Sequence, residues 1–193
     1  VKRSMALATR TQFALAGCDL LRLLFGPLTL PLRPIEWIVS VPGFLALLLN
    51  LEVVWRDEIV PGANDDLSGV AALAVLAARL KATQPDDVEI VFGALGAEEA
   101  SLGGGDALAR DMGSRWDRDR TVIIGLDGMG NGELRYLHPE GEVARVEVPP
   151  WLRSVVDRVA LSEARFHQVK PYAVPVGGSD VAAFLARGWH GVC

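Results

Sequence analysis

Apolar and polar positions divide the chain into two parts of different character. Residues 1–50 are rich in Leu, Ala, Arg and Pro, and residues 14–25 have the spacing of a short amphipathic helix. Residues 35–51 are mostly apolar, but this run is shorter than the roughly 20 residues that span a bilayer. A glutamate, a proline and an asparagine also interrupt it. A core or interfacial segment and a membrane helix therefore both stay open for residues 35–51.

From residue 53 onward, strand-like and helix-like segments alternate. Apolar runs predict strands or extended segments at residues 53–55, 88–95, 121–126, 133–137, 143–148, 165–174 and 189–193, of which 133–137 and 143–148 suggest a hairpin. Ala-, Leu- and Val-rich segments predict helices at residues 68–81, 107–112, 150–161 and 180–186. The helix at 68–81 is apolar on most faces and should be buried. This alternation predicts an α/β fold, with a mostly parallel sheet and helices on both faces.

Composition narrows the class of protein. Half of the 193 residues are hydrophobic and 22% are charged, which excludes a disordered chain. The net charge of −5 argues against a nucleic-acid-binding protein, because such proteins usually carry a basic face. Cys18 and Cys193 lie near opposite ends, so they provide neither a disulfide framework nor zinc-finger spacing. A reducing compartment is the mild default, and the location stays open between cytoplasm and membrane.

The two parts are expected to be separate regions. Residues 1–50 form an apolar, Pro-rich segment, for which membrane association is an alternative, and residues 51–193 form the α/β domain. The chain ends inside the apolar stretch 188–193, which is predicted to be a core strand. We therefore expect the domain to be truncated at its C-terminus.

Acidic residues follow the predicted strands. Asp65 and Asp66 precede the helix at 68–81, Glu98 and Glu99 follow the strand at 88–95, and Asp127 follows the strand at 121–126. Ligands of open α/β sheets bind at the carboxyl ends of strands, so these acids should converge on one rim. Because clustered carboxylates repel one another, a bound divalent metal is the simplest way to hold them together.

Each acidic group also has an ordinary structural interpretation. Asp66 could cap the helix that follows, and Glu98 with Glu99 could open a helix and complement its dipole. Asp127 precedes a glycine and could be a turn residue. The three ordinary interpretations would have to coincide at strand ends, which favours the shared site.

Four segments carry a resemblance to a known family. PGANDDLSG at 61–69, FGALGAEE at 92–99, LDGMG at 126–130 and GGSDVAAFLARG at 177–188 occur in the order seen in M28-type zinc aminopeptidases. The resemblance implies a three-layer αβα sandwich with a mixed sheet, of the zinc-exopeptidase (phosphorylase/hydrolase-like) type. It also implies two zinc ions, a peptide or N-terminal amino-acid substrate, and hydrolysis of a peptide bond by an exopeptidase, most closely an aminopeptidase.

Roles follow from the resemblance position by position. It implies that Asp65 bridges the two zinc ions, that Glu99 binds one of them and that Asp127 binds the other. It implies that Glu98 is the general base that takes a proton from the attacking water. Asp57 matches the residue that orients the first histidine ligand of the family.

The chain departs from the family at that first histidine. The family places it two residues before Asp57, where this chain has Trp55, and an indole nitrogen cannot ligate a metal because it is only a donor. A carboxylate set of Asp65, Glu99 and Asp127 would bind zinc more weakly, and it would discriminate less against Mn²⁺ or Mg²⁺. The departure leaves room for one zinc ion or none.

The second histidine ligand is also missing from the expected place. One branch of the family has it directly after the Ser179–Asp180 pair, where this chain has Val181. The segment instead resembles a second branch, which includes the glutamate carboxypeptidase II-like proteins and has its histidine later, so the ligand is expected beyond Cys193. The histidines that are present, at positions 138, 167 and 190, match no ligand position.

Two functions therefore stand side by side. The first is a zinc-dependent exopeptidase, favoured by the acids at positions 65, 98, 99 and 127. The second is a catalytically impaired relative that acts as a binding or membrane-associated module, favoured by Trp55.

Overall fold

The structure is a computed structural model that describes residues 2–26, 33–56, 58–141, 144–175 and 177–193. It divides into two compact units, Val1–Val60 and Pro61–Cys193. The described part of the first unit is helical up to Arg56, and the second unit holds the mixture of helices and strands.

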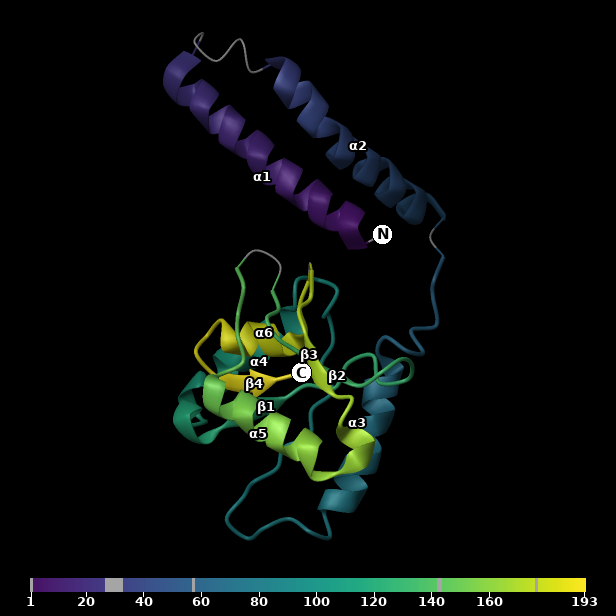
Figure 1. Ribbon diagram of the computed structural model, residues 1–193, viewed down its shortest axis with the longest axis vertical. Helices are drawn as coiled ribbons and strands as arrows, with labels where there is room; N and C mark the ends of the chain where they lie inside the picture. Colours follow the sequence, from purple (N-terminus) through teal and green to yellow (C-terminus); the bar gives the residue numbers. More distant parts are fainter. Residues whose placement is uncertain (1, 27–32, 57, 142–143, 176) are drawn as a thin grey trace. The chain divides into compact units, whose positions relative to one another are not determined.

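The first unit is a pair of antiparallel helices, α1 (Lys2–Phe25) and α2 (Arg33–Arg56), which lie side by side (Figure 1). The helix predicted for residues 14–25 is confirmed, and it begins earlier, at Lys2. Residues 35–51 lie inside α2, which contains Pro42. Across the described ranges, no helix combines the length and the apolar character needed to cross a bilayer.

The strand predicted for residues 53–55 is wrong, because these residues form the end of α2. A short apolar segment that follows a continuous apolar run has no periodicity of its own, so the pattern cannot separate a strand from the last turn of a helix. Trp55 lies in this turn with 90% of its surface exposed.

The helices predicted for the second unit are confirmed within a few residues. They are α3 (Leu67–Leu80), α4 (Gly103–Asp111), α5 (Pro150–Ser162) and α6 (Asp180–Leu185), with short 3-10 turns at Met112–Ser114, Arg118–Arg120 and Ala164–Phe166. Proline is well suited to the first position of α5, because its missing N–H would have no partner there.

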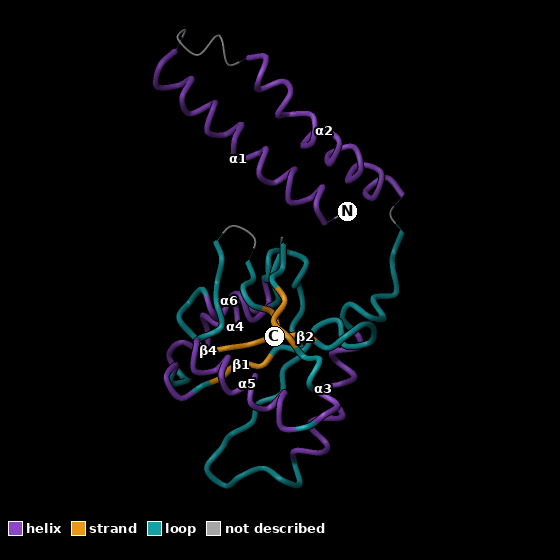
Figure 2. The backbone as a smooth tube through the Cα atoms, in the orientation of Figure 1, coloured by secondary structure: helices purple, strands orange, loops and turns teal. Residues whose placement is uncertain are grey.

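Among the described residues, four short strands form two parallel pairs (Figure 2). They are β1 (Val122–Ile124) with β4 (His190–Val192), and β2 (Arg135–Leu137) with β3 (Lys170–Tyr172). The N–H of Leu137 donates to the carbonyl of Cys193 at 2.8 Å, which joins the two pairs. The mixed α/β class is confirmed, but within the described residues the sheet is fragmentary.

The predicted pairing of residues 133–137 with 143–148 as a hairpin is wrong in this region. Residues 142–143 lie outside the described residues, and β2 pairs with β3 instead. An isolated antiparallel bridge joins Glu140, just after that segment, to Val146. Parallel pairing with a strand more than 30 residues later is a non-local choice, which local sequence patterns do not record.

Residues 88–95 were predicted to be a buried strand, and this is wrong in the structure. The segment has no strand assignment, and Val91 is more than half exposed. The apolar helix α3 was also expected to be buried, yet its Val75 is more than half exposed. A buried strand needs neighbours that accept its backbone hydrogen bonds, and the fragmentary sheet provides none for this segment.

Helix α6 packs closely on the β1–β4 pair. A Cβ on Gly125 or on Gly191 would lie 2.6 Å from a Val181 side-chain carbon, so both positions need glycine. This close contact brings the N-terminal end of α6 near the loop that follows β1. The position of Asp180 at the start of α6 follows from this packing.

Two small clusters form the core of the second unit. One consists of Tyr136, Val148, Leu152 and Val192, and the other of Ala109, Phe184 and Trp189. The ring of Trp189 contacts Phe184 and Trp116 edge to face, with centroids 6.2 Å away in each case. These clusters connect α4, α5 and α6 to the strands.

Leu152 and Leu161 provide a matched test of this core, because both are leucines of α5. Leu152 is 6% exposed and Leu161 is 69% exposed. Leu152→Ala should lower the free energy of unfolding by about 2–5 kcal/mol, because it removes buried methyl groups and leaves a cavity. Leu161→Ala should change it by less than about 0.5 kcal/mol. Urea denaturation followed by circular dichroism measures both, and equal losses would contradict the described core.

Candidate functional site

Asp65 and Asp66 lie at the start of α3. Asp66 is the N-cap, and its Oδ1 accepts a hydrogen bond from the Gly69 N–H at 3.0 Å. The same oxygen accepts from the Gly128 N–H at 3.1 Å, which ties the start of α3 to the loop after β1. The capping role left open for Asp66 is therefore confirmed. Asp65, next to it, lies close enough to Asp127 for their charges to interact.

Glu98 and Glu99 lie in a loop with a strained backbone. Ala97, Ser101 and Leu102 have positive φ angles of 59°, 58° and 56°. Such conformations cost of order 1–3 kcal/mol each for residues with a Cβ, and they cluster at functional sites. The backbone around the two glutamates is therefore held in an unfavourable conformation by the surrounding structure.

Glycines let α4 begin directly against this loop. A Cβ on Gly104 would lie 2.1 Å from the carbonyl oxygen of Gly96. The N–H of Gly105 donates to Oδ1 of Asp180 at 3.0 Å, and a Cβ there would lie 2.7 Å from that oxygen. The alternative in which the glutamate pair opens a helix is wrong, because α4 begins only at Gly103.

The acids of this rim interact electrostatically. Burial, and next the like charges of Glu99, Asp127, Asp180 and Asp65, together raise the pKa of Glu98 to about 7. Burial also raises the pKa of Asp127, and the charges of Asp65 and Glu99 are among those that add to the effect. Carboxylates far apart in the sequence are thus brought within range of one another's charge.

Asp180 joins the cluster, although sequence reasoning gave it no role. Burial raises the pKa of its carboxyl group, the charge of Asp66 adds to the effect, and the hydrogen bond from Gly105 opposes it. The signal that could have found it was the match of its segment to the family pattern.

Glu140 is a second acid that sequence reasoning missed. Its side chain is completely buried, and its Oε2 accepts hydrogen bonds from the N–H of Ser179 at 2.7 Å and from the hydroxyl of Ser179 at 2.9 Å. Its Oε1 has no hydrogen-bond partner among the described residues. Because Ser179 is the N-cap of α6, Glu140 fixes the start of that helix and hence the backbone next to Asp180.

The three histidines each contact backbone or ring groups of the second unit. The N–H of Val148 donates to Nδ1 of His138 at 3.2 Å. His167 Nε2 lies 3.2 Å from a backbone oxygen, and the ring of His190 packs edge to face on Trp151. Trp55 belongs to the other unit, and Asp57 lies outside the described residues.

The sequence pattern that defines Peptidase family M28 matches residues 50–193. The chain belongs to peptidase family M28. The resemblance drawn from the four motifs is therefore confirmed at the level of the family. No curated protein and no solved structure gave a match to the chain.

Membership relates this M28 chain to metallo-exopeptidases, which typically bind zinc. In the described part of the chain, no group of three or more His, Cys, Asp or Glu side chains is placed to hold a metal ion. The chemistry of the acids nevertheless fits a cation, because burial and then neighbouring negative charges raise the pKa of Asp127, and a divalent ion would relieve that repulsion. The roles of Asp65, Glu98, Glu99 and Asp127 stay predictions.

Glu140 gives the site a testable pH dependence. Burial is the main cause that raises the pKa of its carboxyl group above the ordinary value of 4.5. The unfolded chain therefore ionises first as pH rises, and ionisation then favours unfolding. Relative to Glu140→Gln, the wild type should lose stability as pH rises above about 4.5, until the raised pKa is passed.

Urea unfolding of both proteins across this pH range measures the effect. Glu147→Gln is the matched control, because it removes a carboxylate from an exposed position of the same segment. A wild-type curve that stays parallel to that of Glu140→Gln would contradict the burial of this carboxyl group.

Proposed function

We propose that this M28 chain is a zinc-dependent exopeptidase, most closely an aminopeptidase, that hydrolyses a terminal peptide bond. The observation that carries the proposal is the electrostatic grouping of Asp65, Glu98, Glu99 and Asp127 in a family of metallopeptidases. Family membership by itself indicates only common ancestry. The grouping of these particular acids is an additional reason to expect catalytic activity. The substrate class is a peptide with a free end.

Asp65, Glu99 and Asp127 are the residues that would hold the metal. Carboxylate oxygens are accepted ligands of zinc, and Asp65 is proposed to bridge two ions as the family pattern implies. When bound, zinc lowers the pKa of water and polarises the scissile carbonyl. Because the set lacks histidine, its affinity for zinc should be lower than that of a site with imidazole ligands.

Glu98 is proposed to move the proton. It lies next to Glu99, so one carboxylate of the pair can bind metal while the other stays free. Glu98 would take a proton from the attacking water and give it to the leaving amine, as general acid–base catalysis requires. The strained loop that includes Ala97 and Leu102 supports this role, because it fixes the backbone on both sides of the pair.

The finer fold is also a proposal. We propose that residues 51–193 belong to a three-layer αβα sandwich, with a mostly parallel mixed sheet. The two parallel strand pairs and the contact of α6 with β1 and β4 support it. A full sheet would also give residues 88–95 the neighbours that their apolar character calls for.

A non-catalytic relative is the second candidate, and Trp55 is the observation that favours it. An indole stands where the family has a histidine ligand, and that side chain is almost fully exposed. Loss of that ligand would leave the fold and remove tight metal binding. The protein would then act as a binding or membrane-associated module.

Glu98→Gln and Glu99→Gln separate the two proposed roles. Glu98→Gln should abolish release of amino acids from aminoacyl-nitroanilides, because the amide cannot accept the proton, and it should leave bound zinc nearly unchanged. Glu99→Gln should lower both activity and bound zinc, because it removes a ligand. Elemental analysis after equilibration with zinc and a colorimetric assay give the two readouts.

Glu133→Gln is the control, because Glu133 is an exposed glutamate outside the cluster. If activity and bound zinc fall together in Glu98→Gln, the assignment of the base is wrong. If the wild type binds no divalent metal even at millimolar supply, the non-catalytic candidate replaces the peptidase.

A further inference from the structure

The helix pair α1–α2 exposes large apolar side chains that a protein in water would normally bury. Many of its large apolar side chains face away from the partner helix, and the most exposed include Leu23 (84%), Trp37 (77%), Ile38 (73%) and Trp55 (90%). Further exposed apolar residues of the pair are Phe13, Leu20, Leu21, Leu24, Phe25, Ile35, Val41, Phe44, Leu45, Leu47, Leu48, Leu49 and Leu51. A pair of helices folded for water would bury such side chains and expose its polar ones.

Most half-buried positions of the two helices hold small or polar residues, and Leu15 and Val39 are exceptions. In α1 the described half-buried positions are Thr11, Leu15, Cys18 and Arg22, and in α2 they are Glu36, Val39, Ser40, Pro42, Gly43 and Ala46. Arg22 and Glu36 form an ion pair between the helices. The large apolar side chains are therefore left on the outer faces of the pair, where they are free to contact lipid.

The charge of this segment is opposite to that of the rest of the chain. Residues 1–56 contain six basic and three acidic residues, a net charge of +3, whereas the whole chain has −5. Residues 57–193 therefore carry −8. A basic, apolar helix pair complements a bilayer surface with anionic headgroups. Two copies of the pair would each carry a net charge of +3, so they would repel each other.

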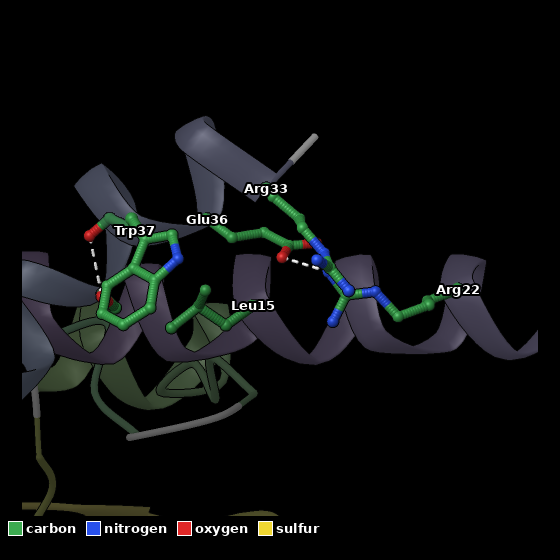
Figure 3. A pocket seen from close by; sticks show the side chains of 6 residues that line it. Leu15, Arg22, Arg33, Glu36 and Trp37 are labelled. Carbon is green, nitrogen blue, oxygen red and sulfur yellow. Dashed lines mark hydrogen bonds and ion pairs between the residues drawn. The ribbon is translucent and has the colours of Figure 1, made fainter. Parts of the chain in front are cut away.

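An open hollow of about 440 Å³ lies between the helices and joins the charged and apolar features. Figure 3 shows Arg22 and Arg33 reaching toward Glu36, with the Trp37 ring beside Leu15. Oε1 of Glu36 is buried and has no hydrogen-bond partner in the described part of the chain. Two guanidinium groups next to an exposed indole are typical of the headgroup layer of a membrane.

We propose that α1 and α2 form a membrane-surface anchor, which inserts its outward apolar side chains into a bilayer with anionic headgroups. Arg10, Arg33 and Arg56 meet the headgroups, and Trp37 and Trp55 lie at the border of the hydrocarbon layer. The anchor lies on the bilayer rather than across it. It does not depend on whether the second unit is catalytic.

Co-sedimentation of the full chain with vesicles tests the anchor. Binding to vesicles of phosphatidylglycerol and phosphatidylcholine should be about tenfold or more tighter than binding to phosphatidylcholine alone, and it should weaken as salt is raised. Arg10→Glu/Arg33→Glu should remove the preference for anionic lipid. Trp37→Ser/Ile38→Ser should weaken binding to both vesicles by about tenfold or more.

Trp151→Ser/Leu161→Ser is the matched control, because it removes exposed apolar side chains from the second unit. It should bind like the wild type, and circular dichroism checks that each variant is folded. A second measurement uses conservative Trp→Phe changes and follows tryptophan fluorescence in anionic vesicles that contain brominated lipid. It should quench tryptophan fluorescence in the wild type, and much less in Trp37→Phe/Trp55→Phe.

Four results would overturn the anchor. Equal binding to the two vesicle types would remove the anionic surface as its target. Unchanged binding of Trp37→Ser/Ile38→Ser, or quenching that persists in Trp37→Phe/Trp55→Phe, would show that another surface meets the lipid. A stable dimer that ignores vesicles would assign the apolar faces to a second copy.

Discussion

Carboxylates that lie close together in a poorly hydrated place must bind a cation, take up protons or move apart, and the second unit is built around this constraint. The charges of Asp65, Glu99 and Asp180 all reach Glu98, whose pKa rises to about 7. A fold without a use for these acids would gain stability by dispersing them. Membership of a metallopeptidase family suggests a reason for keeping the acids together, because a bound metal ion would need carboxylate ligands. The proposed function follows from the constraint and the family together.

Backbone contacts, rather than packing of large side chains, hold the acids in place. Asp66 joins α3 to the loop after β1, and Asp180 joins α6 to the start of α4. Glu140 accepts two hydrogen bonds from Ser179 at the start of α6. Asp180 and Glu140 thus accept from backbone N–H groups at the starts of α4 and α6, and Asp66 also accepts from Gly69 in the first turn of α3, where no helical partner exists. Structural acids thus surround the acids proposed for chemistry.

The two units differ in where they place their large apolar side chains. The second unit buries Trp189 and Phe184 in its core, as a protein in water does. The first unit places Trp37 outside and the Arg22–Glu36 pair between its helices. One chain therefore holds an acidic part suited to water and a basic, apolar part suited to a lipid surface. Together, the proposed anchor and the proposed peptidase activity would place hydrolysis next to a membrane, where substrates at that surface have a raised local concentration.

The sequence by itself determined the helices, the family and the candidate acids, because helix periodicity, capping and short motifs are local properties. Asp66 as a cap and Pro150 at the start of α5 could be predicted from neighbours a few residues away. Tertiary structure decided the rest. The pairing of β2 with β3, the exposure of residues 88–95 and the burial of Glu140 depend on groups far along the chain, and a local pattern contains no record of them. Trp55 shows the same limit. Its sequence neighbours are compatible with a strand, but in the structure they form the last turn of the continuous helix α2.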